Sequence, residues 1–196
     1  DPSWLRHHLD AIAEPRVDVV LGPRRPARDT TPLRLMTLYE ETKAAVIFGG
    51  TDHTRYYGYT NNMAVRKRAL VEMGGFDDVL RGADSVFVRR LVDRRGADAV
   101  RYCRSAAVMH LEILTLGHWY AKHAIYGRSN QRNSRRTATC RPLSMRMRWR
   151  TYRAAVREHG LGGTNAALLL AILVGGGLSH ETGRLIGRLG SPAVPS

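Results

Sequence analysis

NMAVRKRALVEMGGFDDVLRGAD, residues 62–84, is the stretch that decides the expected fold. Residues 62–65 look extended, and residues 66–73 predict a short helix. Gly74-Gly75 ends this helix, because glycine readily takes the left-handed backbone conformation found at helix C-termini. Asp84 begins another helix, which we expect to continue to Arg95 and to end at Gly96. A strand followed by two short helices is a local order that suits an α/β protein.

Strands and helices alternate on both sides of this stretch. On its N-terminal side we expect a helix at 4–13, a strand at 17–21 and a helix at 32–48, with 49–60 as a loop or short strand. On its C-terminal side we expect strands at 99–103 and 106–110 and a helix at 116–129. The predicted fold class is therefore α/β. A hydrophobic share of 43% is enough for a real core.

The last section of the chain has a different character. Residues 131–144 form a polar, basic connector, residues 145–159 predict a basic helix, and residues 160–179 carry no charge. The apolar centre of the uncharged segment, 166–178, is shorter than the roughly 20 residues of a membrane span, and six glycines weaken the segment further as a helix. A buried helix, attachment to a membrane surface and a span all stay open. We expect a helical tail over 145–190 and disorder over 191–196.

The chain carries a net charge of +14, and most of the excess is local. No acidic residue occurs between Ile113 and Arg157, a segment that holds eleven Lys and Arg residues. Such a block attracts polyanions, namely phosphate-bearing ligands, anionic lipid or nucleic acid. The two cysteines, Cys103 and Cys140, have no CxxC spacing. We therefore expect neither a zinc site nor a disulfide framework, which suits a reducing cytoplasm.

Short motifs in a characteristic order resemble those of family 2 glycosyltransferases. Asp1-Pro2-Ser3-Trp4-Leu5 resembles the stretch that follows the metal-binding Asp-x-Asp motif of that family. The later motifs that resemble the family are NMAVR at 62–66, GGFD at 74–77, GAD at 82–84 with Arg89 or Arg90 behind it, VMH at 108–110, Trp119, and YGRS at 126–129. Together they extend over about two-thirds of the chain.

This resemblance implies a GT-A fold, of which residues 1–130 would be the C-terminal, acceptor-side part without the N-terminal nucleotide-binding half. It implies transfer of a sugar from a nucleotide-diphosphate donor to an acceptor hydroxyl, with inversion. The acceptor could be a saccharide, a lipid carrier or a metabolite. We expect a bacterial protein of the cytoplasm, or of the cytoplasmic face of the membrane, and a fragment of a larger enzyme.

Asp84 is the expected catalytic residue. Inverting transfer needs a carboxylate that takes the proton from the acceptor hydroxyl as it attacks the sugar, and Asp84 stands at the position that matches the base of the family. The alternative is that Asp84 only caps the helix that follows, where an acidic side chain is favoured by free N–H groups and the helix dipole. Ala83 stands where the family usually has Glu, so the contribution of that acid is absent.

Five further residues are candidate ligand-binding residues by the same resemblance. His110 would face the donor diphosphate or its metal, as a neutral imidazole can, or it is a structural residue at a strand end. Asn62 would bond sugar hydroxyls, and Arg66 would pair with phosphate, although Arg66 could equally be a surface charge. Arg89 would bind the acceptor or the donor. Trp119 could stack on a sugar or lipid acceptor, or it could belong to the core.

The chain contains no Asp-x-Asp pair. Without those carboxylates the Mg²⁺ or Mn²⁺ ion expected for the family loses its main ligands. We therefore expect little or no transferase activity from this chain alone, no tight binding of a nucleotide-sugar with manganese, and an exposed sheet edge. The alternative function is a basic nucleic-acid-binding module or a membrane-surface module that uses the Arg-rich segment 128–153.

Overall fold

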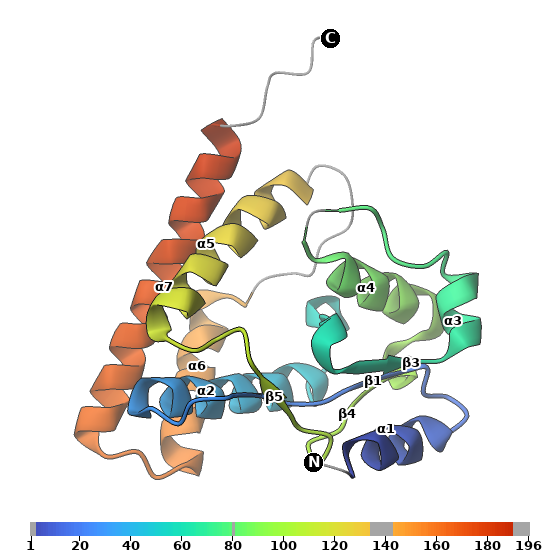
Figure 1. The fold of residues 1–196 in the computed structure, drawn as a ribbon, viewed down its shortest axis with the longest axis horizontal. Helices are drawn as coiled ribbons and strands as arrows, with labels where there is room; N and C mark the ends of the chain where they lie inside the picture. The colour runs from blue at the N-terminus through green and yellow to red at the C-terminus, as the bar shows by residue number, and fades with distance from the viewer. Residues whose placement is uncertain (1–2, 80, 134–142, 190–196) are drawn as a thin grey trace.

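The structure is a computed structural model that describes residues 3–79, 81–133 and 143–189. It is a mixed α/β protein with long helices and short strands (Figure 1), which confirms the expected class. The first elements are α1 (Trp4–Ala13), β1 (Val19–Leu21), β2 (Arg24–Pro26), α2 (Thr31–Phe48), η1 (His53–Arg55), η2 (Thr60–Asn62), β3 (Met63–Val65), α3 (Lys67–Glu72) and α4 (Ala83–Arg95). The others are η3 (Ala97–Ala99), β4 (Val100–Tyr102), β5 (Val108–His110), α5 (Leu116–Asn133), α6 (Met145–Glu158) and α7 (Gly163–Leu189).

The strands form two small sheets. β1 lies between β3 and β4, antiparallel to the first and parallel to the second, and Val20 is opposite Ala64 and Arg101. β2 and β5 form a separate parallel pair in which Arg25 is opposite Met109. The sequence predicts a loop after Gly22, whereas residues 24–26 form a strand. Residues 24–26 form a strand because β5 lies beside β2, just as β4 lies beside β1. The parallel pairing is interrupted between these two pairs.

The chain bends between the two parallel strand pairs, and the side-chain amide of Asn62 bridges the bend. A Cβ on Gly22 would lie 1.9 Å from the carbonyl oxygen of Ala106, so the close approach of the two segments requires glycine. Asn62 lies at the same place, and its Nδ2 donates to the carbonyls of Pro23 and Ala106, both at 2.8 Å. The amide thus satisfies the Ala106 carbonyl at the bend and is a second donor to the Pro23 carbonyl, which also accepts from the N–H of Val108 at 3.0 Å.

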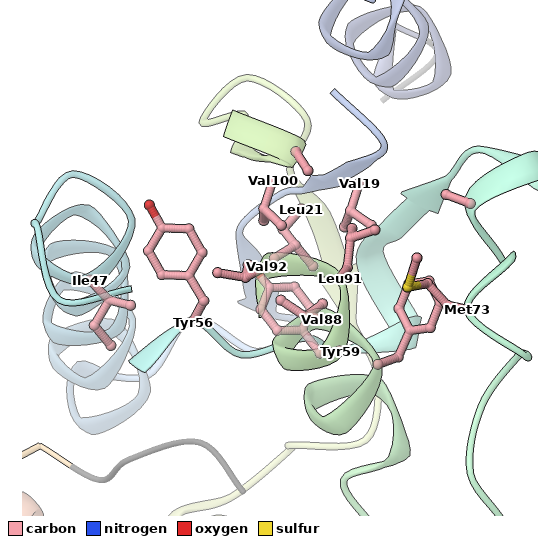
Figure 2. Close-up of a cluster of buried hydrophobic side chains, with 13 residues drawn as sticks. Val19, Leu21, Ile47, Tyr56, Tyr59, Met73, Val88, Leu91, Val92 and Val100 are labelled. Atoms are coloured by element: carbon pink, nitrogen blue, oxygen red, sulfur yellow. The ribbon is translucent and has the colours of Figure 1, made fainter. Parts of the chain in front are cut away.

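The main core lies between the three-stranded sheet, α2 and α4. Val19 and Leu21 of β1 pack with Val88 and Leu91 of α4, and Ile47 of α2 joins the same cluster from the other side (Figure 2). Four of these side chains are fully buried and Ile47 is 5% exposed. Full burial of an aliphatic side chain contributes about 1.5–3 kcal/mol, so this cluster fixes α4, and with it Asp84, against the sheet.

α5 and α7 form a long helix pair; the sequence predicts a helix at 116–129 and a helical tail over 145–190, but not that they pack together. The glycines were expected to weaken the segment as a helix, yet α7 is continuous over residues 163–189. They serve close packing: a Cβ on Gly183 would lie 1.9 Å from the Ala124 carbonyl oxygen, and one on Gly127 would lie 2.0 Å from that of His180. Within the described ranges, α7 is the one helix long and apolar enough to cross a membrane by length and composition.

The structure describes only part of the expected basic connector, 131–144, and of the segments that follow it. α5 continues past Ser129 to Asn133, into the segment expected as connector. α6 packs on α2 and on the first half of α7, where Ala155 and Leu169 are both fully buried. Cys103 is free. Residues 134–142, with Cys140, and the segment 191–196 expected as disordered lie outside the described residues.

Candidate functional site

Asp84 lies in the first turn of α4, where backbone amides hold both of its carboxylate oxygens. Gly82 enters the helix with a left-handed φ of 90°, which a side chain would disfavour. Oδ1 of Asp84 accepts a hydrogen bond from the N–H of Ser85 at 2.8 Å, and Oδ2 accepts one from the N–H of Thr60 at 3.2 Å. The side chain is only half-buried. The N-cap residue is Gly82, and Asp84 accepts from an N–H within the first turn while it presents a solvent-accessible carboxylate.

The loop that contains Gly58 is hydrogen-bonded to the first turn of α4 and so helps to fix the position of the Asp84 carboxylate. The hydroxyl of Ser85 donates to the carbonyl of Gly58 at 3.1 Å and accepts from the N–H of Gly58 at 3.2 Å. A Cβ on Gly58 would lie 2.7 Å from the carbonyl oxygen of Asp84. The turn before Thr60 therefore packs directly on the helix backbone, and both oxygens of Asp84 are held by ordered groups.

Tyr126 of α5 lies within electrostatic range of both Asp84 and Arg24 of β2. Burial raises the pKa of the Tyr126 phenol, and the negative charge of Asp84 adds to this rise while Arg24 opposes it. The guanidinium of Arg24 lies 3.9 Å from the centre of the Tyr59 ring, a cation–π contact. The group thus combines a carboxylate, a phenol and a half-buried cation from three different elements.

His110 of β5 lies in the same electrostatic neighbourhood. Its side chain is 11% exposed, and its Nε2 lies 3.5 Å from Oε2 of Glu112, which also pairs with Lys122. Its buried Nδ1 has no hydrogen-bond partner among the described residues. Burial lowers the pKa of His110, Lys122 and Arg24 lower it further, and Glu112 partly opposes them. We refer to Asp84, Tyr126, Arg24 and His110 as the Asp84 cluster.

Two hollows in the described structure lie elsewhere. One of about 430 Å³ lies between α1 and β3, and one of about 690 Å³ lies beside α2 and β4; neither is lined by Asp84 or His110. The members of the Asp84 cluster are partly exposed side chains from α4, α5, β2 and β5.

Asn62 is a structural residue rather than a ligand-binding one. It is 1% exposed, and both of its amide hydrogens are used at the bend. Its Oδ1 accepts from Nε1 of Trp4 at 2.8 Å and from Nε2 of His8 at 2.9 Å, so Nε2 carries the proton. These four bonds leave the amide no capacity for a sugar hydroxyl, which corrects the expectation from the sequence.

Replacing Asn62 with Ala is expected to lower the free energy of unfolding by about 2–4 kcal/mol. The change leaves the ring N–H groups of Trp4 and His8 and the buried carbonyl of Ala106 without this partner, and each such group costs about 1–3 kcal/mol, partly offset by water or relaxation. Urea denaturation followed by circular dichroism measures the effect. Asn61 is exposed, so Asn61→Ala is the matched control, with an expected change within about 0.5 kcal/mol. Equal effects of the two changes would contradict this role.

Arg66 and Arg89 also make internal contacts. Arg66 donates to the carbonyl of Val17 at 2.7 Å and to that of Glu14 at 3.0 Å, so it ties the end of α1 to β1. Arg89 is 8% exposed; it donates to the carbonyl of His53 at 2.6 Å and pairs with Asp93. Their hydrogen bonds connect segments of the fold that are distant in sequence, and neither arginine belongs to the Asp84 cluster.

Trp119 belongs to the core, which is the second of the two alternatives left open for it. It is 5% exposed and lies against α7, where a Cβ on Gly176 would come within 2.4 Å of the indole. Its ring centre lies 3.9 Å from that of His123. A flat face for a sugar is therefore not available at this position. The indole instead fills the space that the glycine leaves.

Three partly buried histidines are expected to make the fold less stable in mild acid. Burial lowers the pKa of His110, His123 and His180. The histidines of the unfolded chain, with pKa values near 6.5, then bind protons at a pH at which those of the folded chain stay neutral. The contribution of these histidines to the free energy of unfolding is therefore complete above about pH 6.5 and falls as the pH drops below it. The urea midpoint should stay constant from about pH 8 to 7 and decrease towards pH 5.

The same titration of variants separates these histidines from other groups. His123→Asn should make the decrease shallower, because one depressed site is removed. His118 is exposed on the same helix, and His118→Asn should leave the profile unchanged. A midpoint that rises on acidification, or equal profiles for both variants, would show that the histidines are not responsible.

No cluster of three or more metal-binding side chains occurs within the described part of the chain. His110 has Glu112 as its one carboxylate neighbour at 3.5 Å, and two ligands do not complete a divalent-cation site. The described residues therefore do not form such a site by themselves.

The sequence predicts roles for Asp84 and His110, but it did not assign roles to Arg24 or Tyr126. Tyr126 lies in the YGRS motif at 126–129, which was a usable signal. Arg24 lies in a segment that the sequence predicts as a loop, so no motif indicated a functional role for this residue. Comparison of the chain with protein-family models, with curated proteins and with solved structures gives no match.

Proposed function

We propose that this chain is the acceptor side of a glycosyltransferase that transfers a sugar from a nucleotide-diphosphate donor to an acceptor hydroxyl, with Asp84 as the base. The observation that carries the proposal is the half-buried carboxylate of Asp84, whose two oxygens are held by the N–H groups of Ser85 and Thr60. A base fixed on a rigid helix start can meet an acceptor hydroxyl without reorganisation. The motif resemblance supplies the reaction class.

In the proposed step, the acceptor hydroxyl loses its proton to a carboxylate oxygen of Asp84 while its oxygen attacks the anomeric carbon of the sugar. The bond from that carbon to the donor diphosphate breaks on the opposite side, so the configuration inverts and the nucleoside diphosphate leaves. Arg24 and His110 would supply a cation and an imidazole to the site, and a guanidinium suits a phosphate-bearing group. The electron pair of the broken bond stays on the leaving phosphate.

The fold supports the proposal at the level of the sheet. β1 is parallel to β4 and antiparallel to β3, and helices cover the sheet, which is compatible with the acceptor side of a GT-A domain. We place the reaction at the cytoplasmic face of a membrane because the helical tail combines the basic α6 with the apolar α7.

Donor turnover tests the proposal. The natural gene product is incubated with a panel of nucleotide-diphosphate sugars and Mn²⁺, and the released nucleoside diphosphate is measured. Water can replace an unknown acceptor, so slow donor hydrolysis is expected even without the true acceptor. No release from any donor, in the presence of candidate saccharide and lipid acceptors, would refute the proposed reaction.

A further inference from the structure

α6 carries a row of unpaired arginines. Arg146, Arg150, Arg153 and Arg157 recur at helical spacing on its exposed face, and none of them forms an ion pair with a described residue. Trp149, on the same side of the helix, is 51% exposed. Arginine and tryptophan on one exposed helical face are typical of a helix that meets lipid headgroups.

α7 carries an apolar stripe on the face away from α5. Its large members at helical spacing are Val174, Leu178, Leu185 and Leu189, which are 55%, 66%, 55% and 88% exposed. With Ala167 and Ala171, also exposed, the stripe extends over about 33 Å at the rise of an α-helix. Glu181, the one acid in the α7 sequence, pairs with Arg184 at 3.3 Å. A soluble protein rarely leaves such a stripe uncovered.

The packing of α7 favours a position in the plane of a membrane surface over a span. The other face of α7 contacts α5 along much of its length through Gly176, Gly183 and Gly187. α5 carries Lys122 and Arg128, which are costly in hydrocarbon. A spanning α7 would have to abandon α5 or pull it into the bilayer, whereas an in-plane α7 keeps this contact.

We propose that the α6–α7 hairpin binds the surface of an anionic lipid bilayer, with the apolar stripe of α7 in the headgroup–acyl boundary and the arginine row of α6 against lipid phosphates. Charge complementarity favours this occupant: every copy of the chain carries the same exposed arginine row on α6, so the positive charges of two copies would repel. The inference does not depend on the proposed transferase.

Vesicle flotation of the 196-residue chain tests the proposal. Binding is expected to vesicles that contain phosphatidylglycerol, to be at least about tenfold weaker to pure phosphatidylcholine, and to weaken with salt. The exposed Trp149 should shift its fluorescence to the blue on binding, and Trp149→Phe should remove the shift. Equal binding to both vesicles, or preference for a nucleic acid that competes the chain off anionic vesicles, would overturn the proposal.

Variants separate the arginine row from net charge. Arg146→Gln, Arg150→Gln, Arg153→Gln and Arg157→Gln together should lower the partition coefficient about 100-fold or more. The matched control removes the same charge from exposed arginines elsewhere, with Arg6→Gln, Arg16→Gln, Arg28→Gln and Arg104→Gln, and should have a much smaller effect. Equal losses from the two sets would mean that net charge alone drives binding, against the proposal.

Separate experiments test the apolar stripe of α7 and the orientation of α7 relative to the membrane. Leu178→Gln with Leu185→Gln should weaken flotation about tenfold or more without changing the urea midpoint, because both side chains are exposed. Carbonate should extract the bound protein, as expected for an in-plane helix. Resistance to carbonate would indicate a span, and dimers in light scattering that these two substitutions disrupt would assign the stripe to a second copy; either result overturns the proposal.

Discussion

Donor turnover by the Asp84→Asn variant should fall about 10²–10⁴-fold, the range of contributions of general-base catalysis. The amide keeps the size of the side chain and a carbonyl oxygen that can accept from the N–H of Ser85, but it cannot take the acceptor proton. Asparagine is also a favoured residue at helix starts, so α4 should stay intact. The measurement is the rate of nucleoside diphosphate release, with the dissociation constant of the donor determined in parallel.

Two matched variants make this result specific. Asp78 is exposed six residues before Asp84, so Asp78→Asn removes a nearby charge and should leave turnover within about twofold. Asp84→Glu keeps the carboxylate and displaces it, and should retain more activity than Asp84→Asn. If Asp84→Asn keeps most of the activity while its urea midpoint is unchanged, Asp84 is only a helix cap.

Replacing Gly183 with Ala should produce the largest loss of stability on α7. The new Cβ would lie 1.9 Å from the Ala124 oxygen and 2.7 Å from its carbon. Because the obstacle is backbone, α5 and α7 must separate over their contact. We expect the free energy of unfolding to fall by about 3 kcal/mol, measured by urea denaturation.

Gly177 provides the matched control on the same helix. A Cβ there would meet nothing within 4 Å, so Gly177→Ala should raise stability by about 0.5–1 kcal/mol through helix propensity alone. The two substitutions are chemically identical and differ only in what the methyl group meets. A loss at Gly177 comparable with that at Gly183 would indicate that the glycines act through something other than close packing.

Local sequence signals were sufficient for most of the fold. The helix expected at 4–13 has those bounds, and the helices expected from residues 32 and 84 begin one residue earlier, at Thr31 and Ala83. Periodicity and glycine stops lie within short segments, so they can be read directly. β2 was missed because Arg24-Arg25-Pro26 carries no strand pattern and pairs only where β5 lies beside it. α7 was underestimated because the value of its glycines depends on α5.

The site could be predicted less well than the fold. Asp84 follows from a motif at a helix start, and its exposure agrees with that expectation. Asn62 and Trp119 belong to motifs as well, but a motif does not distinguish a residue that binds a ligand from one that shapes the fold. Their burial, at 1% and 5% exposed, decides the matter. Arg24 reaches the cluster through tertiary packing, which no local pattern reports.

The bend closed by Asn62 sets a limit on how homologous chains can differ in length. The carbonyls of Pro23 and Ala106 accept from one amide group, and Ala106 lies in the short segment, residues 103–107, that joins β4 to β5. An inserted or deleted residue there would carry the Ala106 carbonyl out of reach and shift the register of β5 against β2. Natural variants should therefore tolerate substitutions at exposed positions of this segment but keep its residue count constant, while gaps accumulate in other loops.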